Sequence, residues 1–313
     1  MFSYRHGFHA GNHADVLKHM VLVQVLEHLL QKDKPFWVID THAGGGLYDL
    51  TSGYATKSGE SASGIANLWP MRRDKSIPEA VRSLLKQVAL LNDGDDLKWY
   101  PGSPQLAAQM LREGDHLRLF ELHPTEIKLL ESHFAGVKRG VSIQGADGFA
   151  SLKGCLPPPP RRGLVHIDPP YENKDDYRRV LQTLKDAIPK FNSGTYAIWY
   201  PEVARREAIQ FPAQLKRLAA VVGFARHAQV HVLRKILPQT ASHDGVVVDD
   251  SDSDHEGPGC LVGNAQNLTA PATGRSQTTP TRRRAGPSAL SYTATAPRPT
   301  WPTAPPTYSE GTA

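Results

Sequence analysis

Apolar and polar positions along the first 235 residues follow the pattern of strands separated by helices. Short apolar runs that predict strands occur at 36–39, 117–120, 141–143, 164–167, 196–199 and 228–233. Helical stretches lie between several of these runs, and a repeated strand, loop and helix is typical of a parallel sheet covered by helices on both faces. The pattern therefore predicts an α/β fold.

Two helical regions are expected outside this alternation. The first helix should begin near Asn12, whose side chain can cap it. Its apolar face is predicted to be formed by Val16, Met20, Val23, Leu26 and Leu30. The segment at about 51–97 interrupts the alternation and contains a helical run around 81–91. We interpret it as a small helical insertion that follows the start of the first strand's helix.

The chain changes character beyond about Pro238, where the regular apolar periodicity disappears. An acidic patch at 249–254 is followed by three arginines at 282–284 and a Pro/Thr/Ala-rich run at 293–307. Such a composition buries too little apolar surface to offset the entropy of the chain. We therefore expect one folded domain over 1–238 and a low-complexity, disordered tail over 239–313.

The composition changes this picture only slightly. With 40% apolar residues the 313-residue chain can bury a core, and its two cysteines, Cys155 and Cys260, predict no disulfide framework, as expected in a reducing cytoplasm. The amino terminus does not resemble a secretory signal, and no apolar run approaches the length of a membrane span. A net charge of +5 suits a polyanionic partner, although many proteins of similar charge bind none.

Glycines follow the first predicted strand, at the sheet edge where ligands bind. Residues 40–46 (DTHAGGG) include His42 and Gly44, and the three glycines permit a tight turn with close approach of the backbone to a ligand. The spacing matches neither the dinucleotide nor the phosphate-loop pattern. An ordinary turn between a strand and a helix would explain this segment equally well on its own.

Acidic residues follow the next two predicted strands. Glu121 stands where a carboxylate can accept both hydroxyls of a ribose, although a solvated strand-end acid is the simpler interpretation of this residue alone. Asp147 and Gly148 could hold the edge of an adenine while Phe149 packs beside it. Asp-Gly is also a very common turn.

The most specific motif is Asp168-Pro169-Pro170-Tyr171, directly after the run at 164–167. An exocyclic amine is a poor nucleophile, because its lone pair is conjugated with the ring. Asp168 and the carbonyl between the prolines can accept hydrogen bonds from such an amine, and the prolines restrict the direction of that carbonyl. Tyr171 can offer an aromatic face to a flipped base. A rigid turn is the alternative, but the position of the motif after the glycine loop and the two acids disfavours it.

These motifs, in this order, resemble the amino-group methyltransferases that use S-adenosylmethionine, and more narrowly the RlmJ family of 23S ribosomal RNA adenine-N6 methyltransferases. The resemblance covers about 1–235. It rests on residues 4–19 (YRHGFHAGNHADVLKH), 40–44 (DTHAG), 100–104 (YPGSP), 121–124 (ELHP) and 168–171 (DPPY). It implies a Rossmann-like class I methyltransferase sheet with a helical motif at the amino terminus.

The resemblance also implies roles for individual residues. Those expected to contact the cofactor are His19, His42, Ser103, Glu121, Asp147 and Gly148. Asp168 would act at the amine and Tyr4 would meet the RNA. Lys18 precedes His19 on the first helix and can reach the same cleft. The amino-terminal histidines could instead be polar packing residues, and we expect no metal site because no cysteine or acid joins them at ligand spacing.

The implied partner is 23S ribosomal RNA, protein-free or partly assembled, and we expect a cytoplasmic monomer without membrane association. A DNA adenine methyltransferase shares this chemistry, but no separate domain for reading duplex sequence is visible. Protein glutamine methylation is a further alternative, although those enzymes usually begin the tetrapeptide with Asn. The resemblance ends after about Val232, where family members continue into a final strand pair. A catalytically silent RNA-binding factor with an exposed sheet edge is therefore the third alternative.

Overall fold

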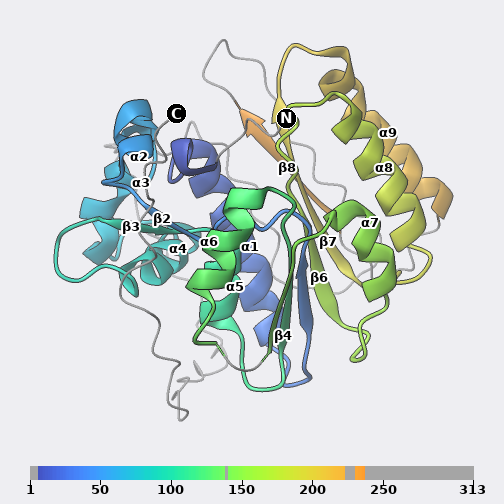
Figure 1. Ribbon diagram of the computed structural model, residues 1–313, viewed down its shortest axis with the longest axis horizontal. Helices are drawn as coiled ribbons and strands as arrows, with labels where there is room; N and C mark the ends of the chain where they lie inside the picture. The colour runs from blue at the N-terminus through green and yellow to red at the C-terminus, as the bar shows by residue number, and fades with distance from the viewer. Residues whose placement is uncertain (1–5, 138–139, 223–229, 237–313) are drawn as a thin grey trace, which may run out of the picture. The chain divides into compact units, whose positions relative to one another are not determined.

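The central element of the fold is a parallel sheet of six strands in the order β5-β4-β1-β6-β7-β8 (Figure 1). The computed structural model describes residues 6–137, 140–222 and 230–236. The strands are β1 (Trp37–Asp40), β4 (His116–Phe120), β5 (Val141–Gln144), β6 (Gly163–Ile167), β7 (Thr195–Glu202) and β8 (Val230–Ile236). Each contains or overlaps one of the six predicted apolar runs, so the α/β fold is confirmed. The tail predicted for 239–313 lies outside the described residues.

Helices cover both faces of this sheet. Helices α1 (His13–Leu30), α5 (Ser103–Met110) and α6 (Pro124–His133) lie on one face, and α7 (Gly148–Leu152), α8 (Asp175–Ala187) and α9 (Arg206–Val222) lie on the other (Figure 1). Alternate strand residues such as Ile39, Val165 and Ile198 pack with α7, α8 and α9 into one apolar cluster. Their strand neighbours Val38 and Leu164 are buried on the α1 side.

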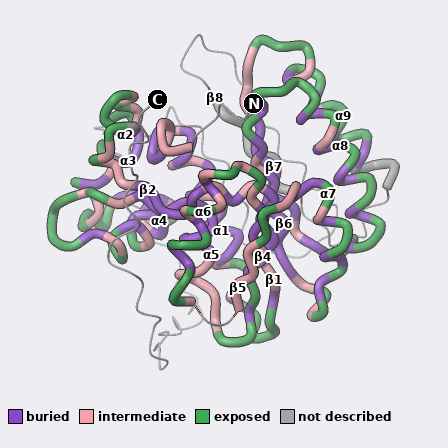
Figure 2. The backbone as a smooth tube through the Cα atoms, viewed as in Figure 1, coloured by how far each residue is buried: buried purple, intermediate pink, exposed green. Residues whose placement is uncertain are grey.

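Helix α1 begins where the sequence predicts, but its buried face is different. Asn12 caps the helix by accepting a hydrogen bond from the Asp15 amide at 2.9 Å. Of the predicted apolar face, Val23 and Leu26 are buried, whereas Val16, Met20 and Leu30 are only half-buried. The first turns of the helix instead bury the polar residues Asp15, Lys18 and His19. Figure 2 shows buried stretches along the strands of the central sheet, which this helix covers. The three polar side chains face the ends of the strands, where they have polar partners.

A second, two-stranded antiparallel sheet flanks the insertion. Strand β2 (Leu47–Asp49) follows the glycine loop directly and pairs with β3 (Trp99–Pro101). Between them lie α2 (Gly53–Ser58), α3 (Ile65–Leu68), α4 (Glu79–Ala89) and the 3₁₀ turns Glu60–Ser63 and Trp69–Arg73. The sequence predicted that the insertion follows the start of a helix. The structure shows instead that it follows strand β2. The helix that leads from β1 to β4 is α5, and it comes after the whole insertion.

The insertion holds the amino-terminal segment in place. The Asn12 side-chain amide donates to Glu60 Oε2 at 2.8 Å, and the Ile65 amide donates to the Gly11 carbonyl at 2.8 Å. Gly64 permits this close approach, since a Cβ there would lie 2.2 Å from the Gly11 carbonyl oxygen. Asn12 thus both caps α1 and joins it to the insertion.

Replacing Asn12 with alanine removes both contacts. Asn12→Ala is expected to lower the free energy of unfolding by about 1–2 kcal/mol, the usual effect of losing a helix cap together with a side-chain hydrogen bond. Urea denaturation measures this change. Asn67→Ala, at an exposed position of α3, should change stability by less than about 0.5 kcal/mol. Equal effects of the two substitutions would contradict the role of Asn12.

Candidate active site

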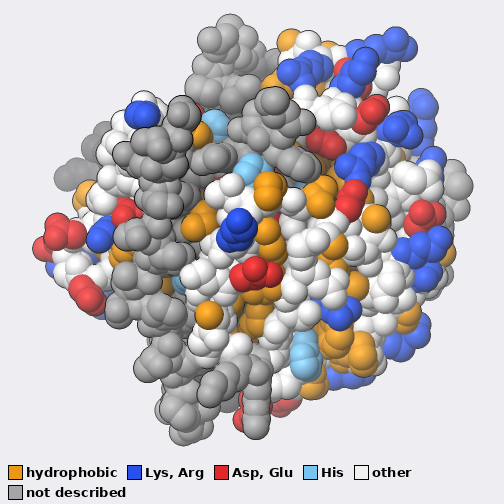
Figure 3. Space-filling model, in the orientation of Figure 1, with side chains coloured by type: hydrophobic (Ala, Val, Ile, Leu, Met, Phe, Trp, Pro, Cys, Tyr) orange, Lys and Arg blue, Asp and Glu red, His pale blue; other side chains and the backbone are white. Residues whose placement is uncertain are grey.

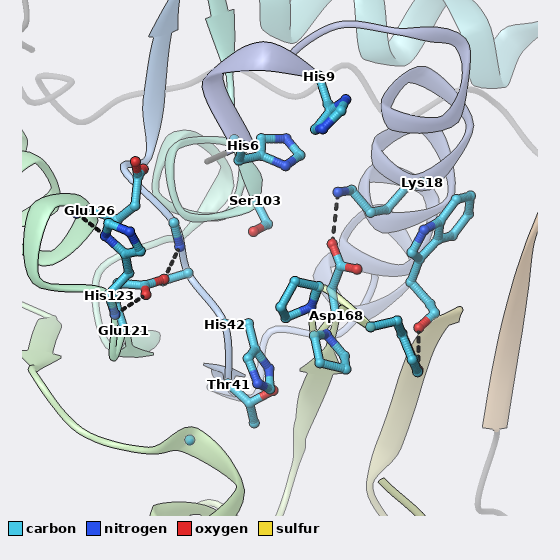
Figure 4. A pocket seen from close by; sticks show the side chains of 18 of the residues that line it. His6, His9, Lys18, Thr41, His42, Ser103, Glu121, His123, Glu126 and Asp168 are labelled. Carbon is cyan, nitrogen blue, oxygen red and sulfur yellow. Dashed lines mark hydrogen bonds and ion pairs between the residues drawn. The ribbon is translucent and has the colours of Figure 1, made fainter. Parts of the chain in front are cut away.

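The carboxyl ends of the strands open into a cavity of about 420 Å³. Every described residue that the sequence predicted to bind the cofactor or to act on the amine lines it. These residues are Lys18, His19, His42, Gly44, Ser103, Glu121, Asp147, Gly148, Asp168, Pro169, Pro170 and Tyr171. Figure 4 labels Lys18, His42, Ser103, Glu121 and Asp168 among them. The predicted RNA contact Tyr4 lies outside the described residues. The fold therefore brings together functional residues that are spread over more than 150 positions of the chain.

Glu121 and the glycine loop form one side of this cavity. Glu121 Oε2 accepts a hydrogen bond from the Gly44 amide and Oε1 accepts one from the His123 amide, both at 2.7 Å. Burial raises the pKa of Glu121 above its ordinary value, against the lowering effect of these two bonds. Gly44 has a left-handed φ of +64°, and a Cβ there would lie 2.5 Å from the Tyr48 hydroxyl oxygen. Both observations favour glycine at position 44, whose amide donates to Glu121.

Asp40 organises the floor of the cavity. Its Oδ2 accepts a hydrogen bond from the Ser103 hydroxyl at 2.7 Å, and its Oδ1 accepts one from the His42 amide at 3.1 Å. Burial alone would raise the pKa of Asp40, but the neighbouring His166 and these hydrogen bonds bring it below its ordinary value. The carboxylate is thus held in its charged form beneath two groups that the sequence placed at the cofactor.

His42 lies on this floor as a neutral imidazole. Its ring meets the Phe149 ring edge-on with 4.6 Å between the centroids, and its Nδ1 is 2.8 Å from the Thr41 hydroxyl oxygen. Burial lowers the pKa of His42 from 6.5 to about 4. The ring therefore offers hydrogen-bonding nitrogens without a positive charge at neutral pH.

Asp147 and Gly148 occupy the next strand end. Asp147 Oδ1 accepts from the Phe149 amide at 3.0 Å and so caps α7, while Oδ2 forms an ion pair with Arg179. A Cβ on Gly148 would lie 2.0 Å from the Thr41 carbonyl oxygen. Gly148 therefore allows two loops to touch, and the Asp147 carboxylate is held rigidly by its partners at the cavity wall.

Asp168 stands one residue beyond β6, in contact with α1. Lys18 Nζ lies 2.7 Å from Asp168 Oδ2 and 2.8 Å from Asp15 Oδ1 (Figure 4). Asp15 is also held by His6 Nε2 at 2.8 Å. Burial would raise the pKa of Asp15, but His6, Lys18 and His19 keep it well below its ordinary value. Lys18, which was expected near the cofactor, is thus placed directly on the Asp168 carboxylate.

His19 lies deeper than Lys18 on the same helix. It is 1% exposed, and its Nδ1 is 2.9 Å from the Tyr100 hydroxyl. Burial lowers the pKa of His19 well below its ordinary value, although Asp15 acts in the opposite direction. A neutral His19 therefore lies at the base of the cavity, with Tyr100 of β3 holding its ring.

Tyr171 departs from its expected orientation. Its ring is 4% exposed and packs on Tyr177, with 4.6 Å between the ring centroids, and it belongs to the apolar cluster under α8 and α9. Its hydroxyl donates to the Trp199 carbonyl at 2.8 Å. The broad aromatic face that was expected to stack on a base is therefore turned mostly toward the core, and Tyr171 has a left-handed φ of +53° in this position.

Several residues at the cavity were given no role of their own in the sequence analysis. Arg179 and Trp199 line the cavity, as do Thr41 and Leu122, which were named only as members of motifs. Asp15 supports the cavity through Lys18, and Asp40 lies beneath it as the partner of Ser103. The i,i+3 spacing of Asp15 and Lys18 is a signal that could have revealed their pairing. The others follow from the arrangement of strands and have no local motif. Among the described residues, no group of three or more His, Cys, Asp or Glu could hold a metal ion, and no helix is long and apolar enough to cross a membrane.

The sheet order and the cavity define a Rossmann-like methyltransferase fold, and comparisons with known proteins narrow the class. The family model "Ribosomal RNA large subunit methyltransferase D, RlmJ" matches residues 33–233. The chain belongs to this RlmJ family of methyltransferases.

Individual relatives agree with this assignment. Two proteins named ribosomal RNA large subunit methyltransferase J, from Escherichia coli K12 and Haemophilus influenzae, are each 47% identical to 66% of this chain, which matches 72% and 73% of their lengths. The crystal structure of protein LPL1258 from Legionella pneumophila superposes with a TM-score of 0.61 at 38% identity, covering 67% of this chain and 76% of that one.

The buried, neutral His42 makes stability depend on pH. Its folded-state pKa of about 4 lies below the ordinary 6.5, so the unfolded chain takes up a proton that the folded chain resists. Its contribution to stability is present above 6.5 and is lost as the pH falls toward 4. His42→Gln should therefore show a shallower loss of the free energy of unfolding over this range.

Urea unfolding at several pH values measures this difference. The exposed His28 provides a control, and His28→Gln should keep the wild-type slope. An unchanged slope in His42→Gln would contradict the buried, neutral state of His42.

Proposed function

We propose that the chain transfers a methyl group from S-adenosylmethionine to the exocyclic N6 amine of an adenine in 23S ribosomal RNA. The observation that carries this proposal is the meeting of Asp168, Pro169 and Pro170 with Glu121 and the glycine loop in one cavity. Hydrogen-bond acceptors suited to an amine and a carboxylate suited to the hydroxyls of a ribose thus line the same cavity. Relatives named as ribosomal RNA large subunit methyltransferases support the RNA substrate.

The cavity suits S-adenosylmethionine at the ends of β1, β4 and β5. Glu121 has both oxygens oriented by backbone amides, and each retains a lone pair for a ribose hydroxyl. Gly44 leaves the space that a side chain would fill. Asp147 and Gly148 border the adenine end, while His19, His42 and Ser103 are proposed to contact the remainder. When bound, the cofactor supplies an electrophilic methyl group.

The amine-activating part of the site is the tip of β6. The Lys18 ion pair takes Asp168 Oδ2, so Oδ1 remains to accept a hydrogen bond from the target amine. The Pro169 carbonyl is the second proposed acceptor, and the two prolines limit its movement. Together these acceptors draw electron density toward the nitrogen and orient its lone pair. With its ring in the core, Tyr171 supports the strand tip from beneath, and its remaining surface at the cavity wall contacts the base.

The surface beyond this cavity carries cations that suit RNA. Exposed basic side chains on and just before α8 and α9 include Lys174, Arg178, Lys185, Arg205, Arg206, Lys216 and Arg217. Figure 3 shows Lys and Arg side chains over these helices, interspersed with acidic ones. Phosphate contacts of this kind position an RNA without reading its sequence. We propose 23S RNA, protein-free or partly assembled, as the cytoplasmic substrate of a monomer whose Tyr4 contacts the RNA.

Asp168→Asn is the most direct test of the chemistry. Asparagine keeps one acceptor oxygen and has a donor NH2 group in place of the other, so methyl transfer is expected to fall by about a thousandfold or more. Calorimetry should show cofactor affinity within a few-fold of wild type, because the cofactor's proposed contacts lie on other helices, strands and loops. Asp175→Asn, at an exposed acid of α8, serves as the matched control. Retained turnover in Asp168→Asn would reject the proposed role.

Tritiated cofactor separates the candidate substrates. Protein-free 23S RNA, assembled large subunits and duplex DNA are incubated with wild-type protein, and the labelled nucleoside is identified by chromatography. We expect N6-methyladenosine from 23S RNA and none from duplex DNA. Labelling of DNA would instead indicate a DNA adenine methyltransferase, and absence of cofactor binding would indicate a silent RNA-binding factor.

Glu121 should make cofactor binding depend on pH. Because burial raises its pKa, the carboxylate is protonated at a higher pH than an ordinary glutamate, and affinity should fall as the pH is lowered through that range. Glu121→Gln should weaken binding by about tenfold or more and flatten this dependence. Calorimetry measures both effects, with Glu131→Gln, at an exposed position of α6, as control. A wild-type pH profile in Glu121→Gln would refute the assignment.

A further inference from the structure

A buried histidine without a hydrogen-bonded ring lies beneath the cavity. His166 of β6 is 1% exposed, and among the described residues neither of its ring nitrogens has a hydrogen-bond partner. Burying unpaired polar groups is costly, so such a side chain requires an explanation. The proposed cofactor contacts do not include it, and it lacks access to a substrate.

The neighbour that explains His166 is Asp40. The two residues are register partners on β1 and β6, and His166 Nδ1 lies 3.6 Å from Asp40 Oδ1. This distance is slightly long for a hydrogen bond but close for an electrostatic contact. A carboxylate can only accept, so an attractive contact requires the proton to be on Nδ1. His19 is close enough to interact electrostatically with His166.

The backbone of His166 strengthens the same junction. Its carbonyl oxygen accepts hydrogen bonds from both the amide and the hydroxyl of Thr41, each at 3.1 Å. Asp168 follows two residues later, and Thr41 begins the loop that carries His42. His166 therefore lies where two strands meet. One is β6, which ends beside Asp168, and the other is β1, which leads to the loop that carries His42.

We propose that His166 is a positioning residue that carries its proton on Nδ1, directs it to Asp40, and so holds the Ser103 hydroxyl and the His42 amide in place for the methyl donor. Asp40 accepts from both groups, at 2.7 Å and 3.1 Å. With His166 as third partner, the buried carboxylate is restrained to one orientation. This inference rests on the proposed function, since it assigns Ser103 and His42 to the cofactor.

Two substitutions separate the polar contact between His166 and Asp40 from the packing of the ring. His166→Asn places an amide donor close to the position of Nδ1 but reduces the volume of the side chain. His166→Phe keeps the ring volume but removes the donor. If positioning of Asp40 is the role, His166→Phe should weaken S-adenosylmethionine binding by about tenfold and His166→Asn by less than about threefold. KM for the cofactor should rise more than kcat falls.

The control is another histidine that is equally buried. His133 is 1% exposed and bonds to Gln105 at 2.7 Å, away from the cavity wall. His133→Phe should lower thermal stability and leave cofactor affinity unchanged. Thermal unfolding of all variants confirms that each binding measurement is made on folded protein.

The state of the His166 ring can be read directly. In ¹⁵N-histidine NMR of the full chain, the signal lost in His166→Asn identifies His166, and we expect its proton on Nδ1. Unchanged affinity in His166→Phe, weaker binding in His166→Asn than in His166→Phe, or a proton on Nε2 alone would each overturn the proposal. A wild-type chain without affinity for S-adenosylmethionine would instead overturn the proposed function, so the two failures can be distinguished.

Discussion

The ion pair between Lys18 and Asp168 is the interaction on which the site depends. It joins the first helix to the tip of β6 across 150 positions of sequence, with 2.7 Å between Nζ and Oδ2. Lys18 is almost completely buried and would be costly in that place without a carboxylate. Asp15 gives it a second one at 2.8 Å. The folded protein therefore stabilises Asp168 in one orientation before any substrate arrives.

The parallel sheet places the proposed cofactor-binding residues beside the ion pair of Lys18 and Asp168. Because the strands end at one edge, the glycine loop of β1, Glu121 of β4 and Asp147 after β5 lie on one side of Asp168. The insertion between β2 and β3 holds the amino-terminal segment, and with it Asp15 and His6, against the cavity. The insertion, which contains none of the proposed catalytic residues, thus fixes the position of the amino-terminal segment beside the cavity.

Much of this arrangement could be predicted from sequence because it is local. The six strand positions follow from apolar runs, and the cap at Asn12 follows from its side chain. The buried face of α1 could not be predicted from apolar spacing, since Asp15, Lys18 and His19 are buried by partners on other elements. Strands β2 and β3 are three residues each, too short to show alternation.

In the candidate site, too, some features could be predicted from local sequence and others depend on contacts between distant parts of the chain. The residues carried by motifs line one cavity, whereas the inward turn of Tyr171 depends on its positive φ and on Tyr177 and Trp199. Asp40 and His166 meet only because β1 and β6 are adjacent in the sheet. No local sequence pattern predicts the pairing of Asp40 with His166, and only the folded structure reveals it.

A crystal structure with S-adenosylhomocysteine and an adenosine nucleotide tests the central claim most directly. The account predicts the cofactor's ribose on Glu121 and the nucleotide's N6 within hydrogen-bond distance of Asp168 and the Pro169 carbonyl. A nucleotide bound with its N6 away from Asp168, or a cofactor that leaves Glu121 without a ligand, would contradict it.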